Sequence, residues 1–208
     1  RHKQNNSAKH ISEQAWNTAA VANAGDGTNE HPTQALLDAM TIADSFNRVG
    51  GDLSGLSVVI VGDIVRSRVA RSNAHLLPRL GANVTVVAPA PLLPADIDSW
   101  PVKLSSRLDD VIADADAVMA LRIQHERVTG TSGLEGLDYR QDFGLTAERV
   151  ARMKPTSIVM HPGPMNRGVE VDDAVADGPR SVIRTQVRNG VWMRMAILQH
   201  LIDARRSQ

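Results

Sequence analysis

The sequence has no cysteine, only 3% aromatic residues and no excess of either charge among its 208 residues. Without cysteine it can form no disulfide and no thiolate metal site, which favours a reducing cytoplasm as its location. The 23 basic and 23 acidic residues cancel. No global field therefore favours nucleic acid or an anionic membrane, and any anion binding must be local. No apolar run approaches the roughly 20 residues of a membrane span, and no signal peptide is visible.

The residues that are present alternate between apolar runs and helical patterns, which predicts an α/β fold with a doubly wound parallel sheet. Near-continuous β-branched runs are typical of strands buried on both faces of such a sheet. We expect strands at residues 19–23, 56–61, 83–88, 117–121 and 157–160. We expect helices at residues 8–14, 32–47, 68–80, 104–113 and 146–153, a final amphipathic helix after 189–190, and a surface loop over 125–144.

A glycine loop followed by a helix, over residues 23–34, is the stretch around which the chain is organised. Pro32 fits the first turn of a helix, where a missing N–H does no harm. His31, Thr33 and Gln34 are then polar groups at a helix N-terminus, which suits an anion or a polarised carbonyl. A simple capped helix after a tight turn explains the same residues. Spacing predicts that the helix buries Leu36, Met40, Ala43 and Phe46 on one face.

Polar side chains follow several expected strands, and ligands of open parallel sheets bind beyond the carboxyl ends of the strands. These residues are Arg66, Ser67 and Arg68 after the first long run, Arg122 and Gln124 after another, and His161, Pro162, Gly163 and Pro164 after the last. The planar fork of arginine pairs with carboxylates in bidentate fashion, so two such arginines could hold a small dicarboxylate. Solvated surface arginines remain the alternative, and we prefer it for Arg71, Arg79 and Arg107.

Other chemistry is not indicated. A dinucleotide site would need glycines where Arg66 and Ser67 stand, and an acidic residue where Ala88 and Pro89 end a strand. There is no nucleophile elbow, no Walker loop and no clustered spacing of metal ligands. We therefore expect no cofactor and no metal, and catalysis by positioning and charge stabilisation.

Five motifs in order resemble the aspartate carbamoyltransferases of the aspartate/ornithine carbamoyltransferase family. They lie at residues 23–34, 61–64, 67–73, 121–124 and 160–170. The ornithine enzymes typically carry a cysteine in the last motif, and this chain has none. The resemblance implies transfer of a carbamoyl group from carbamoyl phosphate to the amine of L-aspartate, a step of pyrimidine biosynthesis, with a Rossmann-like aspartate-binding domain and no cofactor.

The resemblance also implies roles for single residues. Arg1 and His31 match groups that polarise the carbonyl oxygen of carbamoyl phosphate, and Gln34 matches the residue that faces its amide. Arg68 and Arg122 match those that bind the two aspartate carboxylates. The remaining matches are Gln124 near the aspartate, the carbonyls of Pro162 and Gly163 near the carbamoyl amide and the attacking amine, and Thr33 and Arg194 as supporting residues.

The resemblance also implies where the domain boundaries of the chain lie. Residues 1–34 correspond to the C-terminal piece of a carbamoyl phosphate domain, 35–47 to an interdomain helix, 48–187 to the aspartate domain and 188–208 to a returning helix. The chain begins at Arg1 rather than methionine, and about a hundred N-terminal residues of the family, with its phosphate loop, are expected to be missing. Family members form trimers, sometimes joined by regulatory chains or dihydroorotase, so a homotrimer is expected.

Two alternatives remain at this point. The chain could be a shortened, non-catalytic relative that acts as a binding or assembly module, because the phosphate loop is missing from it. It could also be a carbamoyltransferase with another amino acceptor, for which residues 125–146, the expected mobile loop, would set specificity.

Overall fold

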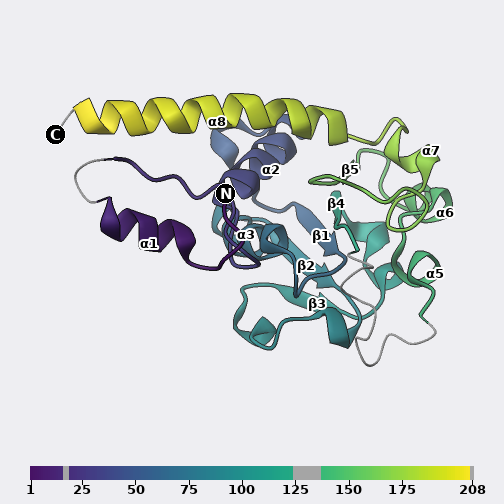
Figure 1. The fold of residues 1–208 in the computed structure, drawn as a ribbon. Helices are drawn as coiled ribbons and strands as arrows, with labels where there is room; N and C mark the ends of the chain where they lie inside the picture. Colours follow the sequence, from purple (N-terminus) through teal and green to yellow (C-terminus); the bar gives the residue numbers. More distant parts are fainter. Residues whose placement is uncertain (16–18, 124–136, 207–208) are drawn as a thin grey trace.

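The computed structural model describes residues 1–15, 19–123 and 137–206, which form a parallel sheet with helices around it (Figure 1). The strands are β1 (Ser57–Val61), β2 (Asn83–Val87), β3 (Lys103–Ser105), β4 (Ala117–Ala120) and β5 (Ile158–Met160). The α-helices are α1 (Ser7–Gln14), α2 (Pro32–Ser45), α3 (Arg68–Leu76), α5 (Tyr139–Phe143), α6 (Ala147–Ala151), α7 (Asp173–Ala176) and α8 (Ile183–Arg206). Short 3₁₀ turns η1 to η6 are Val49–Gly51, Pro78–Leu80, Ala90–Leu92, Ile97–Ser99, Leu108–Asp110 and Ile112–Asp114.

The sheet has the order β3-β2-β1-β4-β5, and every neighbouring pair is parallel. In this register Val59 of β1 lies opposite Thr85 on one side and Val118 on the other. The chain moves outward from β1 in one direction and then returns to place β4 on the other side of β1. This reversal is the switch point at which doubly wound folds bind ligands. The parallel α/β fold expected from the sequence is confirmed.

The core lies on and around the central strands β1 and β4, of which almost every residue is buried. Their valine, isoleucine and methionine side chains leave no polar face, because helices and loops cover both sides. Leu77, Leu92 and Leu108 fill the core from connecting segments. A rigid, fully packed centre therefore fixes where the loops after β1 and β4 emerge.

Helix α2 lies between α3 and α8, and it packs against both of them. Its buried side chains are Thr33, Gln34, Ala35, Leu37, Asp38, Ala39, Thr41, Ile42 and Ala43. The stripe predicted from spacing is therefore wrong in part, since Leu36 is 37% exposed. A helix covered on two sides buries more than one stripe, and its small and polar residues then make the helix contacts.

Helix α8 begins at Ile183, eight residues before residue 191, the start expected after Asn189 and Gly190. These two residues do not break the helix but lie buried where it crosses α2. Asn189 donates from its side-chain amide to the Thr41 hydroxyl at 3.1 Å. A Cβ at position 190 would lie 2.5 Å from Arg194 Nη1 and 3.4 Å from Leu37 Cδ2, so glycine here leaves room for the Arg194 guanidinium and forms no turn.

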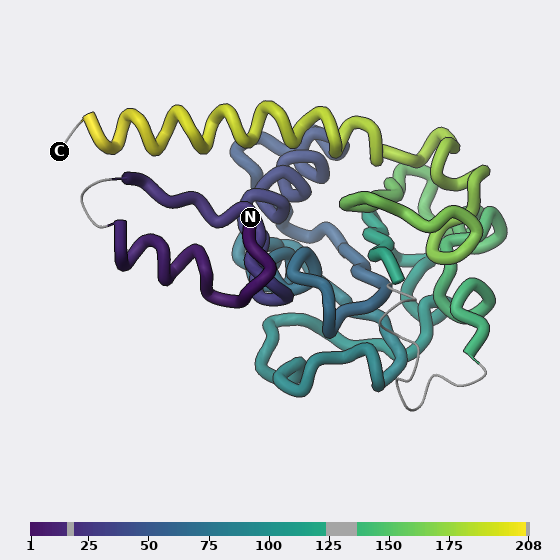
Figure 2. Tube along the Cα trace, in the orientation of Figure 1, coloured from purple at the N-terminus to yellow at the C-terminus, as the bar shows by residue number. Residues whose placement is uncertain are grey.

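An amphipathic helix usually buries its apolar stripe, but the apolar stripe of α8 is exposed in the described part of the chain. Its members are between 48% and 67% exposed: Val187, Val191, Trp192, Met195, Leu198 and Ile202. Figure 2 shows the reason, because the C-terminal half of α8 extends past the sheet, on the side where α1 lies. None of the described helices is long and apolar enough to cross a membrane.

Four other expectations are corrected by the structure. Residues 19–23, predicted as a strand, form none and are not part of the five-stranded sheet. The segment 104–113 is the edge strand β3 followed by η5 and η6, not a helix. Pro78 ends α3 and converts its last turn to η2. Residues 139–143 form helix α5 within the expected loop, and residues 124–136 lie outside the described part of the chain.

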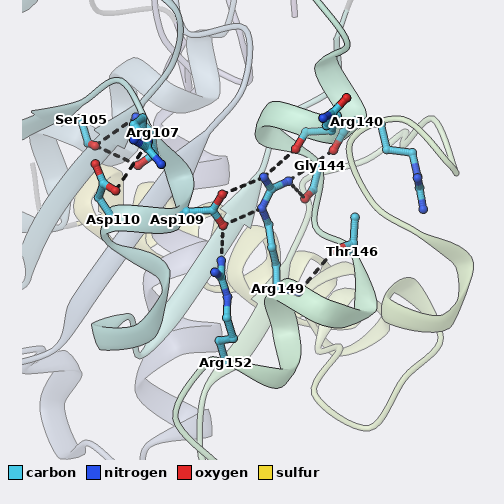
Figure 3. Close-up of polar contacts among 10 residues, drawn as sticks. Ser105, Arg107, Asp109, Asp110, Arg140, Gly144, Thr146, Arg149 and Arg152 are labelled. Carbon is cyan, nitrogen blue, oxygen red and sulfur yellow. Dashed lines mark hydrogen bonds and ion pairs between the residues drawn. The ribbon is translucent and has the colours of Figure 1, made fainter.

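A buried arginine joins α5, α6 and η5 (Figure 3). Arg149 is 9% exposed and its guanidinium donates to both carboxylate oxygens of Asp109, at 3.0 Å each. It also donates to the backbone carbonyls of Arg140, Gln141 and Gly144. Hydrogen bonds from Arg149 and Arg152 outweigh the effect of burial and lower the pKa of Asp109 to about 2. This arginine fixes the end of α5 and the turn that follows it.

Candidate active site

A cavity of about 600 Å³ lies at the carboxyl ends of β1 and β4, where the strand order reverses. We call it the main cavity, and its walls come from five segments. The lining residues are Arg1, His2, Lys3, Asn5, Gly27, Thr28, Arg66, Ser67, Arg68, Val69, Leu121, Arg122 and His161 to Pro164. Five of these carry lysine or arginine side chains, and no acidic side chain lines the described wall. The cavity is therefore suited to a small ligand with several negative charges.

Arg68 and Arg122 both reach this cavity, as the sequence predicted. Arg68 is the first residue of α3, after the N-cap Ser67, and it donates to the Gly27 carbonyl at 3.3 Å. Burial and the charge of Arg1 lower the pKa of Arg68. Gly25 allows this position because a Cβ there would lie 2.8 Å from the Arg68 Cζ. The glycine loop thus shapes the site by letting an arginine pack on its backbone.

Arg1 reaches the main cavity because a turn built on Asp26 holds the first residues of the chain. The backbone N–H groups of Asn6 and Glu30 donate to the Asp26 carboxylate at 2.6 and 3.1 Å. Burial raises the pKa of Asp26, but these bonds and those from the Asn23 and Asn29 amides outweigh it and leave the pKa below its ordinary value. His2, Lys3 and Asn5 reach the cavity in the same way, and no motif signals them.

His31 is the N-cap residue of α2 and is 8% exposed. Its backbone N–H donates to the Ser72 hydroxyl at 2.8 Å, and its Nδ1 lies 3.3 Å from the Thr33 hydroxyl. Burial and the charges of Arg68, Arg1 and Arg194 lower its pKa to about 4. The imidazole is therefore neutral at physiological pH. The charges of Arg1 and Arg68 act on it, although it is not among the residues that line the main cavity.

A second, smaller cavity of about 170 Å³ lies on the other side of His161 and Pro162, which line both cavities. Gln34 and Arg194, two further predicted residues, line this small cavity. Arg194 donates to the Gly190 carbonyl at 2.8 Å. The structure thus brings Arg1, Arg68, Arg122, Pro162 and Gly163 into one cavity, with Gln34 and Arg194 behind it. Gln124 lies outside the described residues.

Asp38 lies behind Gln34, four residues along α2, and is completely buried. It accepts hydrogen bonds from the side-chain amides of Gln34, Asn73 and Gln186, at 2.9, 2.8 and 2.7 Å. Burial raises its pKa to about 6, although these three donors and the charge of Arg194 oppose the shift. Sequence reasoning missed this group. The spacing of Gln34 and Asp38 was a visible signal, but Gln186 is 148 residues away.

The backbone at His161 is held from two sides. Its N–H donates to Gln186 Oε1 at 3.0 Å, and its ring Nδ1 accepts from the Gly163 N–H at 2.9 Å. Its Nε2 lies 3.4 Å from Glu170, and both side chains are buried. Because Nδ1 is an acceptor, the neutral imidazole carries its proton on Nε2, toward Glu170. The carbonyls of Pro162 and Gly163 are therefore set by side chains from α8 and from the following loop.

No group of three or more histidine, aspartate or glutamate side chains in the described residues could hold a metal ion. The site offers guanidinium groups, amides and backbone instead. It can bind an anion, donate hydrogen bonds to an oxygen and accept them from an amide.

Comparison with known proteins decides the family. Residues 54–201 match the Asp/Orn binding domain of aspartate/ornithine carbamoyltransferase, and residues 1–44 match its carbamoyl-P binding domain. This chain belongs to the aspartate/ornithine carbamoyltransferase family. Two relatives are named aspartate carbamoyltransferase catalytic subunit. The one from Corynebacterium urealyticum is 52% identical over 97% of this chain, and the one from Leifsonia xyli subsp. xyli is 49% identical over 99%.

The fold also matches solved members of the family. Aspartate transcarbamoylase from Trypanosoma cruzi, in complex with N-(phosphonacetyl)-L-aspartic acid, gives a TM-score of 0.78 at 32% identity over 95% of this chain. The same enzyme in complex with carbamoyl phosphate and aspartate also gives 0.78, at 31% identity. The chain spans 63% of the length of the C. urealyticum relative and 67% of that of L. xyli. It spans 63% of the first T. cruzi chain.

Proposed function

We propose that the protein transfers the carbamoyl group of carbamoyl phosphate to the amine of L-aspartate, giving N-carbamoyl-L-aspartate and phosphate. The observation that carries this proposal is the main cavity, whose described wall holds five lysine and arginine side chains and no acidic one. A dicarboxylate acceptor gains from such a field, whereas a cationic acceptor such as ornithine is repelled by it. Arg68 and Arg122 are the two arginines assigned to the aspartate carboxylates.

The reaction needs no covalent intermediate on the protein. The aspartate nitrogen attacks the carbamoyl carbon, the carbon–oxygen bond to phosphate breaks, and the proton that the amine loses passes to the departing phosphate. Negative charge develops on the carbamoyl oxygen in between. A donor aimed at that oxygen contributes about 3 kcal/mol, and holding both substrates together about 7–11 kcal/mol.

His31 is the proposed donor, together with Arg1. Its pKa of about 4, set by burial and nearby arginines, keeps it neutral. A neutral imidazole has one N–H, so donating from Nε2 requires Nδ1 to accept. The Thr33 hydroxyl, 3.3 Å from Nδ1, is able to donate to it. This assigns Thr33 the role of fixing the tautomer, and His31 need not act as a base.

The test is an assay of the product of the complete natural gene for aspartate-dependent release of phosphate from carbamoyl phosphate. We expect Arg122→Ala to raise the KM for aspartate at least tenfold, because a hydrogen bond to a charged group is worth about 1.5–3 kcal/mol. Arg107→Ala is the control, since Arg107 is exposed and pairs with Asp110. An aspartate KM that is unchanged in Arg122→Ala would show that the assigned site is wrong. A faster reaction with another amino acid would reassign the acceptor.

A further inference from the structure

The buried Asp38 carboxylate connects two parts of the proposed site for the carbamoyl group, Gln34 and the His161–Gly163 segment. On one side it accepts from Gln34 Nε2, and on the other from Gln186 Nε2, with both bonds on the same oxygen Oδ1. Gln186 in turn accepts from the His161 N–H through its Oε1. A continuous chain of hydrogen bonds therefore runs from Gln34 through Asp38 and Gln186 to the backbone that precedes Pro162 and Gly163.

An ionised carboxylate can only accept hydrogen bonds, and this fixes how each neighbouring amide is turned. Gln34 must present its NH₂ to Asp38, so its carbonyl Oε1 is the end left for the small cavity that it lines. Gln186 is turned in the same way, with its Oε1 toward the His161 N–H. Without the carboxylate, the Gln34 amide could rotate by half a turn, whereas the His161 N–H would still favour the present orientation of Gln186.

The ligand group that matches this arrangement is an NH₂. A carbamoyl amide has two N–H donors and needs acceptors around it, and the turned Gln34 offers one. Carbonyl oxygens of Pro162 and Gly163 are the other proposed acceptors, and their segment is held by Gln186. An amide turned the other way would face the carbamoyl NH₂ with its own donors.

We propose that Asp38 is a positioning residue for carbamoyl phosphate, which orients Gln34 directly and the His161–Gly163 backbone through Gln186. This inference rests on the proposed function, because it takes the carbamoyl amide as the group that Gln34 meets. Asp38 itself is buried and lines neither the main cavity nor the small one. Asp38 fixes which end of the Gln34 side-chain amide faces the substrate. It thereby favours a carbamoyl donor that carries an NH₂ group.

The test compares Asp38→Asn with Asp44→Asn in the product of the complete natural gene. Asp44 also lies on α2 and accepts from an amide of α8, Asn189, but it is exposed and makes no bond to Gln34 or Gln186. We expect Asp38→Asn to lower kcat/KM for carbamoyl phosphate up to about 10²-fold, the scale of a 1 Å misplacement. Asp44→Asn should leave it unchanged.

A double-mutant cycle separates positioning from general destabilisation. In a Gln34→Ala background the effect of Asp38→Asn on carbamoyl phosphate should shrink, because the group that it orients is gone. Full additivity of the two substitutions would overturn the inference. Gln186→Met is a second variant of similar shape, which removes both bonds of Gln186 and carries the test if Asp38→Asn does not fold.

A spectroscopic measurement adds a readout that needs no turnover. The side-chain amide signals of Gln34 and Gln186 in a ¹⁵N-labelled protein should move in Asp38→Asn and stay in place in Asp44→Asn. Because an asparagine oxygen at the place of Oδ1 could still accept from both glutamines, an active parent overturns this inference alone when Asp38→Asn and Gln186→Met both keep normal kinetics. A parent without carbamoyl transfer overturns the proposed function, and with it the substrate for which Gln34 is oriented.

Discussion

At the residue scale, two buried groups of α2 titrate abnormally and in opposite directions. The pKa of His31 falls from 6.5 to about 4 through burial and neighbouring arginines, while burial raises the pKa of Asp38 from 3.8 to about 6. Between pH 4 and 6 the folded protein therefore binds less proton at His31 than the unfolded chain, and more at Asp38. The two groups act against each other on the free energy of unfolding.

The first prediction isolates these two contributions. The His31 contribution is present above pH 6.5 and is lost as pH falls toward 4, whereas the Asp38 contribution is present below pH 3.8 and is lost as pH rises through 6. Asp38→Asn should therefore make the free energy of unfolding rise more steeply with pH between 4 and 6, and His31→Gln should make it rise less. Urea unfolding across this range measures both slopes. Parallel curves for the parent and both variants would contradict the prediction.

A second prediction at this scale concerns the glycine on which Arg68 packs. Gly25→Ala places a Cβ 2.8 Å from the Arg68 Cζ. The guanidinium must move, and we expect the KM for aspartate to rise by roughly tenfold, since a charge-assisted bond is worth about 1.5–3 kcal/mol. Steady-state kinetics on the product of the complete natural gene measures the change.

Gly50→Ala is the matched control for Gly25→Ala. Gly50 also has a positive φ, of 70°, but nothing lies within 4 Å of an added Cβ. Its backbone strain should lower stability without changing either KM. An equal rise of the aspartate KM in both variants would mean that strain, rather than the displacement of Arg68, is responsible.

At the element scale, Arg149 is the joint between helices that are each too short to be stable alone. Helices α5 and α6 have five residues apiece, and isolated helices below about 12 residues are marginal. The guanidinium compensates by binding Asp109 and three backbone carbonyls (Figure 3). A lysine keeps the charge but cannot reach all of these acceptors.

The third prediction follows from that geometry. We expect Arg149→Lys to lower the free energy of unfolding by about 3 kcal/mol, because buried carbonyls are left without donors at about 1–3 kcal/mol each. Arg167→Lys is the control, since Arg167 pairs with Asp173 and Asp177 on the exposed surface. Denaturant unfolding measures the free energy of unfolding of both variants. Similar losses in the two would show that Arg149 contributes no more stability than an arginine on the surface.

Elements buried on both faces were predictable, and those at the periphery were not. Strands β1 and β4 follow from apolar runs that are typical of a covered parallel sheet, and β2 from a β-branched run that includes Thr85. Strand β3 has three residues and two of them are exposed, so no pattern distinguishes it from a helix end. Helix α8 begins earlier than predicted because glycine usually signals a break, whereas here the missing Cβ of Gly190 leaves room for the Arg194 guanidinium.

The candidate active site also contains residues that the sequence predicts and residues that it does not. The arginines at the ends of β1 and β4 were found because topology alone brings strand ends together. The residues that hold Gln34 and the His161 backbone were not predicted, since Asp38 meets Gln186 only when α2 and α8 pack. Such contacts depend on tertiary structure, and one sequence carries no local trace of them.

At the scale of the whole molecule, the stripe of α8 is the largest departure from a normal surface. Six apolar residues lie exposed along it. Five of them, Leu198 included, are spaced by three or four, and Trp192 directly follows one of these five. Exposed apolar surface of this kind promotes association. The fourth prediction is that this chain alone self-associates in a concentration-dependent manner, and that Trp192→Glu combined with Leu198→Glu suppresses it.

Sedimentation velocity over a concentration series measures this association. Leu104→Glu, on the exposed side of β3, is the control and should leave the association unchanged. A monomeric parent, or equal suppression by the control, would contradict the prediction.

The two outer strands of the sheet have three residues each, and residues 180–182 bond along the free side of β5. Too few main-chain groups therefore face outward to recruit a foreign strand. Contacts of this chain with other copies or other proteins should accordingly be made by helices and loops, and fibril growth by edge-to-edge stacking should be disfavoured even at high concentration.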